Sequence, residues 1–379
     1  MQQHYSVPPF VSERLLARPL KTRTSIHRIV LVRFGPLADV VTTLPVIAGL
    51  RQRFPEARIE VVTSEPFVPL FASLPDIQRV HRLHSPQPDW RDVPDLAALA
   101  LRISRADIVI DLQRSYSSRL LVALAWPRAC AAVDRFGPRH VLDRYLDTCR
   151  AAGIDRIEPV YRPQVRSYLE RRGRDLLGVA GIDFDHNGEP RQPLVCLVPA
   201  GEWPTNRWPT QRYVELARRL VHERGATIVL LGDTALATAT REIAATLPNH
   251  TLDLVGRTTI TETVAIVRLL RLVIGDDSPL LRLAWTQAVP TIGIFGASRR
   301  TWSRPHGPHS FSFGSEDLSC GACMRPTCAR GDLFCLARLS VDDVFDAVTA
   351  VPAFREPRKP RPPLQAGPTR RRHSRKAQQ

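Results

Sequence analysis

Apolar residues recur along the chain in short unbroken runs that alternate with amphipathic stretches. The runs are typical of strands buried in parallel sheets, and the stretches of helices that cover them. The first series predicts strands at 28–34, 59–63 and 107–112, with helices at 40–53, 91–102, 117–125 and 141–152. The second predicts strands at 194–198, 227–231, 252–255, 272–274 and 291–295, with helices at 211–223, 235–247, 260–270 and 280–288. Strands that alternate with helices indicate an α/β protein with two tandem, doubly wound, Rossmann-like domains.

The pattern loosens between the two series, where two prolines, a basic helix near 165–177 and a polar run follow one another. We therefore place a linker there and expect ligands to bind in a cleft between the carboxyl ends of the two sheets. The expected parts are an N-terminal extension (1–25), an N-terminal domain (26–158), the linker (159–193), a C-terminal domain (194–351) and a tail (352–379).

Length and hydropathy favour a cytoplasmic protein. The 379 residues, 44% of them hydrophobic, are enough for two ordinary domains. No apolar segment approaches the roughly 20 residues needed to span a bilayer. Glu13, Arg14 and Arg18 interrupt the N-terminal stretch, so that it lacks the apolar core of a signal peptide.

The net charge of +16 is concentrated at the two ends. Residues 1–28 contain five Lys or Arg and one Glu, and residues 352–379 contain nine and one. The tail is rich in Pro and Arg and is expected to be disordered. It is either a solvated tail without a partner or a segment that anionic lipid headgroups attract, at the inner face of a membrane. Specific nucleic-acid binding is disfavoured because no basic reader helix follows the cysteine segment described below.

The segment 275–284 combines the end of a strand, a tight polar turn and the start of a helix. Ser278 is predicted to be the N-cap residue, and Pro279 the first helical residue. Such a turn directs backbone N–H groups and the positive end of a helix dipole towards the space beyond the strand. The segment is either an ordinary capped helix or an anion site.

Four of the seven cysteines form the cluster Cys320-x2-Cys323-x4-Cys328-x6-Cys335. Four thiolates at this spacing can hold a structural zinc or iron ion in a reducing compartment. A disulfide pair is the alternative, and it would require an oxidising compartment. The segment is expected to fix the chain before a last helix near 341–351.

Four motifs, taken in order, resemble glycosyltransferase family 9, the bacterial heptosyltransferases with a GT-B fold. The first is the strand 29–33, its loop to Asp39 and the Thr-Leu-Pro that follows; the second is Pro199 to Pro209. The third is Gly256-Arg257-Thr258. The fourth is 275–278, together with Pro290-Thr291 and Phe295-Gly296. The cysteine cluster also resembles one found in family members.

The resemblance implies an inverting transfer of a sugar, typically heptose from ADP-heptose, to a lipopolysaccharide core or a related surface glycan, without a catalytic cofactor or metal. Asp39 matches the family's proposed general base, which would take a proton from the acceptor hydroxyl. Its alternative role is to cap a helix that starts at Val40. The implied donor-binding residues are Gly201, Thr205, Asn206, Arg207, Thr258, Asp277, Ser278 and Arg282.

Several donor-site positions depart from the family pattern. Ala38 replaces a Gly, and Asn206 replaces a Lys that neutralises the diphosphate. Asp276 stands where Asn is common and adds a negative charge near the expected phosphate site. Pro279 lacks an N–H, and Arg282 replaces a His and adds a permanent cation. Two interpretations follow: a donor pocket retuned around Arg207 and Arg282, or a protein that binds nucleotide or glycan after losing heptosyl transfer.

Overall fold

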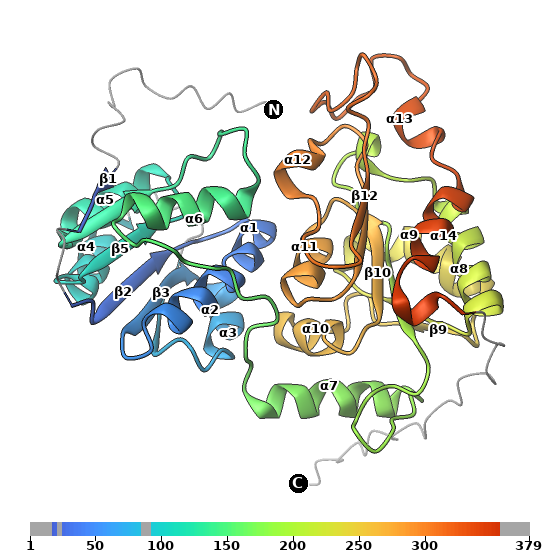
Figure 1. Ribbon diagram of the computed structural model, residues 1–379, viewed down its shortest axis with the longest axis horizontal. Coiled ribbons are helices and arrows are strands. Elements are labelled where there is room, and N and C mark those ends of the chain that lie inside the picture. Colours follow the sequence, from blue (N-terminus) through green and yellow to red (C-terminus); the bar gives the residue numbers. More distant parts are fainter. Residues whose placement is uncertain (1–16, 21–24, 85–91, 357–379) are drawn as a thin grey trace, which may run out of the picture. The chain divides into compact units, whose positions relative to one another are not determined.

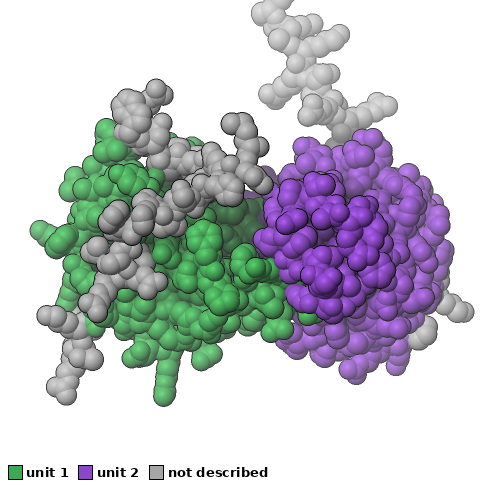
Figure 2. Space-filling view, turned by 90° about the horizontal axis from the view of Figure 1, so that it is seen from above, with its two compact units in different colours: residues 1–166, 285–288, 299–306 green, residues 167–284, 289–298, 307–379 purple. Residues whose placement is uncertain are grey.

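The computed structural model describes residues 17–20, 25–84 and 92–356. Contacts divide the chain into two compact units. The first unit contains residues 1–166, 285–288 and 299–306, and the second contains residues 167–284, 289–298 and 307–379 (Figure 2). Two short segments of the C-terminal half therefore pack with the first unit.

The first unit contains a six-stranded sheet with the order β1-β6-β5-β2-β3-β4 (Figure 1). All neighbours pair in parallel except β1, which runs antiparallel to β6. Its strands are β1 (Ala17–Arg18), β2 (Arg28–Val32), β3 (Arg58–Ser64), β4 (Arg79–Leu83), β5 (Ile108–Asp111) and β6 (Ala129–Ala132). Its helices are α1 (Leu37–Thr42), α2 (Leu44–Arg53), α3 (Val68–Ala72), α4 (Val93–Ile103), α5 (Tyr116–Ala125), α6 (Val141–Ala151) and α12 (Arg300–Ser303).

The second unit contains a six-stranded parallel sheet with the order β12-β11-β10-β7-β8-β9. Its strands are β7 (Leu194–Val198), β8 (Thr227–Leu230), β9 (Thr251–Asp253), β10 (Leu272–Asp276), β11 (Thr291–Ile294) and β12 (Phe311–Phe313). Its helices are α7 (Ser167–Val179), α8 (Thr210–Arg224), α9 (Ala237–Thr246), α10 (Ile260–Val267), α11 (Pro279–Thr286), α13 (Phe334–Ala337) and α14 (Val341–Thr349). The last two residues of α11 count with the first unit.

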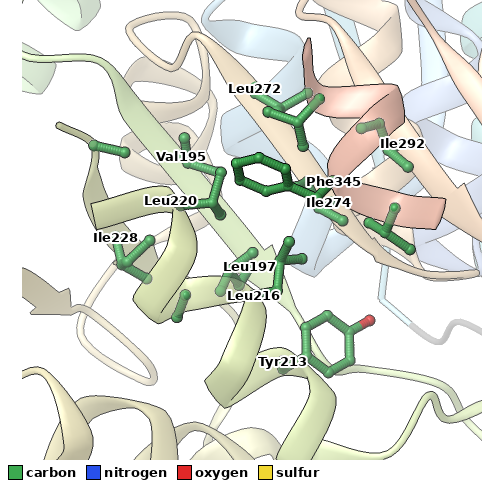
Figure 3. Packing of buried hydrophobic residues seen from close by; sticks show 14 of the residues in the cluster. Val195, Leu197, Tyr213, Leu216, Leu220, Ile228, Leu272, Ile274, Ile292 and Phe345 are labelled. Atoms are coloured by element: carbon green, nitrogen blue, oxygen red, sulfur yellow. The ribbon is translucent and has the colours of Figure 1, made fainter. Parts of the chain in front are cut away.

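The core of the second unit forms where α8 and α14 cover one face of the sheet (Figure 3). Leu216 and Leu220 of α8 and Phe345 of α14 pack on apolar side chains of β7 and β10. On another surface α7 packs on α10, and Gly173 permits the approach because a Cβ there would lie 2.9 Å from the Cβ of Ala265. The helix expected within the linker is thus an integral part of the second unit.

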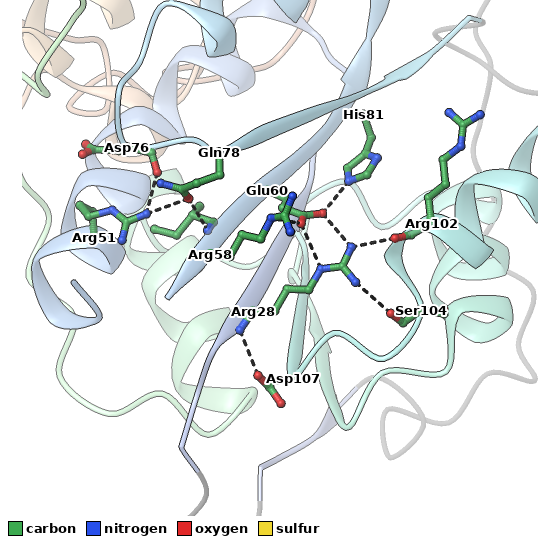
Figure 4. Close-up of polar contacts among 11 residues, drawn as sticks. Arg28, Arg51, Arg58, Glu60, Asp76, Gln78, His81, Arg102, Ser104 and Asp107 are labelled. Atoms are coloured by element: carbon green, nitrogen blue, oxygen red, sulfur yellow. Dashed lines mark hydrogen bonds and ion pairs between the residues drawn. The ribbon is translucent and has the colours of Figure 1, made fainter. Parts of the chain in front are cut away.

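A buried carboxylate joins three strands of the first sheet (Figure 4). Glu60 of β3 accepts hydrogen bonds from Arg28 of β2 and His81 of β4 at 2.8 and 2.6 Å. Burial alone would raise the pKa of Glu60, but these partners outweigh it and lower the pKa to about 2. The carboxylate therefore stays charged and holds β2, β3 and β4 together.

The predicted fold is confirmed, and the sequence pattern missed four strands for recognisable reasons. β4 has the sequence Arg-Val-His-Arg-Leu, whose polar residues suit a sheet edge. β6 is built mainly from alanines, and β1 and β12 are only two and three residues long. The predicted helix 40–53 is two helices, because Pro45 lies in the first turn of α2 and has no N–H.

The predicted N-terminal extension and C-terminal tail each contribute residues to the folded units. Ala17 and Arg18, assigned to the extension, form β1 on the edge of the first sheet. At the other end, Phe354 is buried in the core of the second unit, although the tail was expected to begin at 352. The remaining residues of the predicted extension and tail, 1–16, 21–24 and 357–379, lie outside the described residues. No helix within the described ranges is long and apolar enough to cross a membrane.

Candidate functional site

Asp39 lies just beyond the carboxyl end of β2, in the first turn of α1. Its carboxylate forms an ion pair with the guanidinium of Arg33, the residue that follows β2. Arg33 is buried, and its other terminal nitrogen donates to the carbonyl of Leu112 after β5. The guanidinium is therefore anchored to the sheet and fixes one oxygen of Asp39.

The alternative in which Asp39 caps a helix starting at Val40 is wrong. α1 begins at Leu37, with Pro36 at the N-cap position and no side-chain cap. Asp39 thus occupies the third helical position, where the helix dipole also favours its negative charge. Its side chain, 28% exposed, keeps access to solvent. That combination of an oriented and accessible carboxylate fits a group that takes a proton.

In the second unit, the loop from Gly201 to Trp208 follows β7 and is fastened to the end of β10. Asp276 is fully buried and accepts hydrogen bonds from the N–H groups of Gly201 and Trp208 at 3.2 and 3.0 Å. The hydroxyl of Tyr213 donates to the same carboxylate at 2.9 Å. Three donors from this loop and α8 therefore converge on one side chain.

The expectation that Asp276 adds negative charge near a donor phosphate is wrong in its geometry. Its carboxylate is saturated by the loop beneath the surface. Burial raises its pKa to about 7, because the hydrogen bonds from Trp208, Tyr213 and Gly201 offset only part of the desolvation cost. Asp276 is a positioning residue that shapes the loop.

Thr205 and Asn206 face inwards. The Asn206 side chain accepts from the N–H of Ser298 at 2.9 Å, and the Thr205 hydroxyl donates to the carbonyl of Arg325 at 2.6 Å. Both side chains are buried. In this structure Asn206 therefore braces the loop against the segment after β11, rather than presenting its amide to solvent.

Gly201 and Arg207 determine the shape of the loop's outer edge. A Cβ at Gly201 would lie 2.2 Å from the carbonyl oxygen of Asn206, so that only glycine fits. The exposed Arg207 donates from Nε to the carbonyl of Gly201 at 2.6 Å. Its guanidinium is thus held across the loop, where it can also meet an anion.

The predicted start of α11 is confirmed. The helix begins at Pro279, and the N–H of Leu281 donates to the Ser278 hydroxyl at 3.3 Å. Arg282, one turn on, lies 3.8 Å from the carboxylate of Asp277. The carboxylate of Asp277 therefore neutralises part of the positive charge that Arg282 was expected to bring to this turn.

The structure brings most of the predicted donor residues to one edge of the second sheet. β7 and β10 are parallel neighbours, so the loop after β7 and the turn after β10 are adjacent. Thr258 follows β9, two strands away from β7, and its hydroxyl contacts that of Thr263 at 2.9 Å.

The sequence did not predict the roles of two residues, Arg33 beside Asp39 and Tyr213 beside Asp276. Arg33 is the last residue of the strand in the first motif, which could have drawn attention to it. Tyr213 lies in none of the four motifs.

The cysteine segment joins the same edge through its backbone. The N–H of Met324 donates to the carbonyl of Ala297 at 2.8 Å, and Ala297 N–H in turn donates to the carbonyl of Thr205. Backbone N–H groups of Leu333, Arg330 and Gly331 lower the pKa of the Cys328 thiol. All seven cysteines are free, and the described parts of the chain show no group of three or more His, Cys, Asp or Glu side chains gathered around a metal position.

A family model described as glycosyltransferase family 9 (heptosyltransferase) matches residues 97–333, more than half of the chain. The chain belongs to this family. Lipopolysaccharide heptosyltransferase 1 of Pseudomonas aeruginosa is 26% identical to it over 318 residues, which cover 79% of this chain and 87% of the relative. The resemblance inferred from the four motifs is confirmed.

Solved structures share the fold. A family 9 glycosyl transferase from Veillonella parvula has a TM-score of 0.73 and 19% identity, covering 90% of this chain and 99% of that one. The dodecameric iron-containing heptosyltransferase TibC of enterotoxigenic Escherichia coli, in complex with ADP-D-beta-D-heptose, has a TM-score of 0.52 and 15% identity. The match covers 88% of this chain and 77% of the TibC chain. These structures support the GT-B architecture predicted from the sequence.

Proposed function

We propose that this family 9 protein transfers heptose from ADP-heptose to a lipopolysaccharide core or a related surface glycan, with inversion at the anomeric carbon. The observation that carries the proposal is the Arg33–Asp39 pair at the carboxyl end of β2. Asp39 accepts the proton of the acceptor hydroxyl as that oxygen attacks the anomeric carbon of the donor. Arg33, itself held by the carbonyl of Leu112, orients the carboxylate.

The donor diphosphate is assigned to the edge formed by the loop after β7 and the start of α11. Arg207 and Arg282 supply positive charge, the Ser278 hydroxyl supplies a hydrogen bond, and the start of α11 supplies the positive end of a helix dipole. These groups stabilise the negative charge that grows on ADP as it leaves. Arg282 binds phosphate only in competition with Asp277, which reduces its contribution.

A screen of ADP-, UDP-, GDP- and CDP-sugars tests the donor assignment. With a lipid-linked acceptor, ADP-heptose is expected to give turnover and release of ADP. Arg282→Ala is expected to raise the Kd for ADP about tenfold, because a charge-assisted hydrogen bond contributes about 1.5–3 kcal/mol and Asp277 consumes part of it. Calorimetric titration with ADP measures this change.

Arg271→Ala is the control, since this exposed arginine of the second unit pairs with Glu189 before β10 begins. It is expected to bind ADP as the wild type does. Nucleotide binding without turnover for any donor would instead support the alternative, a retuned or decayed binding protein. The buried Asn206 and the Asp277–Arg282 pair are the features that favour that alternative.

The second part of the proposal is a structural zinc or iron ion at Cys320, Cys323, Cys328 and Cys335. Burial raises the pKa of Cys335, and the other three thiols, which lie close enough to interact with it, raise it further. The backbone N–H groups that surround Cys328 favour its thiolate, which is the form that binds a metal. Cys320 and Cys323 are exposed, so that their side chains can turn towards the other two.

The purified protein is expected to contain about one equivalent of zinc or iron, as for a four-thiolate site. Cys320→Ser with Cys323→Ser should abolish the metal content and lower Tm, because the segment then loses its cross-link. Elemental analysis and thermal unfolding measure the two effects. Cys130→Ser is the control. A metal-free protein that has lost free thiols in a thiol titration would show the disulfide alternative instead.

A further inference from the structure

Two neighbouring helices of the first unit, α4 and α5, carry apolar side chains on both their inner and outer faces. They pack side by side (Figure 1). The inner faces contribute Leu96, Leu99 and Leu121 to the core under the sheet. Amphipathic surface helices normally turn polar residues outwards. The outer faces of these two helices depart from that rule.

Nine large apolar side chains are exposed among the described residues, and five of them belong to this pair of helices and the residue that ends α5. Leu101 and Trp126 are each 76% exposed, and Tyr116 is 85% exposed. The other two are Val93 and Leu124. Single exposed apolar residues are ordinary, whereas a group on adjacent helices indicates an interaction surface.

Trp126 is also unusual in its backbone. It ends α5 in the left-handed conformation, with φ of +47°, at a position where glycine is the common residue. The guanidinium of Arg18 on β1 lies 5.2 Å from its ring centroid. The indole is thus held outside the core beside a cation, an arrangement that suits the boundary between headgroups and acyl chains.

The surroundings of this surface are basic. Arg102, Arg105 and Arg119 have no carboxylate partner among the described side chains, and Asp95 is the exposed acidic residue on α4. A cavity of about 550 Å³ adjoins the end of α4 and is lined by Arg79, Val80, His81, Arg82, His84 and Arg102. Glu65 neutralises part of this charge by pairing with Arg82. The remaining arginines complement a negatively charged surface.

We propose that the outer faces of α4 and α5, with Trp126 at their end, dock this protein on an anionic lipid bilayer. Leu101, Leu124 and Trp126 enter the headgroup region, while the arginines that surround them bind lipid phosphates. The inference rests on the proposed lipid-linked acceptor. Vesicle binding needs neither donor nor acceptor, so its failure is distinguishable from failure of transfer.

The experiment measures binding of the full chain to phosphatidylcholine vesicles with and without phosphatidylglycerol. We expect binding only with the anionic lipid, and at least about a tenfold loss of affinity in Leu101→Ala/Leu124→Ala/Trp126→Ala. Tyr168→Ala/Val179→Ala is the control, because these side chains of the second unit are 51% and 77% exposed. The control variant should bind as the wild type does.

The basic ends of the chain also attract anionic vesicles, and quenching by brominated lipid separates the two contributions. Residues 1–28 and 352–379 contain no tryptophan. Brominated phosphatidylglycerol should quench the wild type and quench Trp126→Phe clearly less. Wild-type protein that ignores anionic vesicles, or a triple variant that binds them unchanged, would overturn the proposal. So would a triple variant whose oligomeric state differs, since a second copy then covers this face.

Discussion

Replacing Asp39 with Asn is expected to lower kcat for heptosyl transfer by about 10³-fold, within the range typical of a lost general base. The amide is nearly isosteric with the carboxylate but cannot accept the acceptor's proton. KM for the donor should change little, because the donor is assigned to the second unit. Release of ADP, followed at saturating donor and acceptor, measures the effect.

Asp147→Asn is the matched control, because Asp147 is also an aspartate of the first unit paired with arginines. It lies on the exposed side of α6 and should retain wild-type kcat. Circular dichroism and Tm of both variants show whether the fold is intact. Full activity of a folded Asp39→Asn variant would remove Asp39 from the mechanism and leave the family membership untouched.

Replacing Asp276 with Ala is expected to destabilise the second unit by about 3–5 kcal/mol. The change leaves two buried backbone N–H groups without an acceptor, and it leaves the Tyr213 hydroxyl only the carbonyl of Val198 at 3.5 Å. The loop from Gly201 to Trp208 then loses its attachment to β10, and ADP affinity should fall with it. Chemical denaturation and nucleotide titration measure the two losses.

Asp233→Ala is the control for Asp276. Asp233 is an exposed loop aspartate of the same unit, whose carboxylate accepts from the N–H of Ala235 at 2.9 Å. Losing that cap should cost about 1 kcal/mol. Equal losses in the two variants would show that Asp276 contributes no more than a surface cap.

The pH dependence of the free energy of unfolding tests the role of Asp276 independently. The folded pKa of Asp276, about 7, lies above the ordinary 3.8. Between these values the folded state holds the proton and the unfolded state does not, so the contribution of Asp276 to the free energy of unfolding is largest below about pH 4 and is lost as the pH rises to about 7. The Asp276→Asn variant cannot titrate at this position, so its free energy of unfolding, measured by chemical denaturation between pH 5 and 8, should lack this decrease. A wild-type curve as flat as that of the Asn variant would contradict the assignment.

Much of this protein followed from the order of its residues. Apolar runs predicted five of the six strands of the second unit. The runs are clearest at β7, β8, β10 and β11, because parallel strands buried on both faces leave no room for polar side chains. The start of α11 was predicted from Ser278 and Pro279, whose effects are local. The family followed from four motifs in a fixed order.

Only the tertiary structure decided what the candidate residues do. Sequence numbers do not tell where a side chain points, and Asn206 and Asp276 both turn inwards because buried backbone N–H groups need acceptors. Arg33 meets Asp39 because the end of β2 and the start of α1 lie together, and Leu112 anchors it from β5. The sequence by itself determined the elements, their order and the family, since these depend on local periodicity and spacing. The fold alone decided which polar groups satisfy one another, since that depends on contacts between residues far apart in the chain.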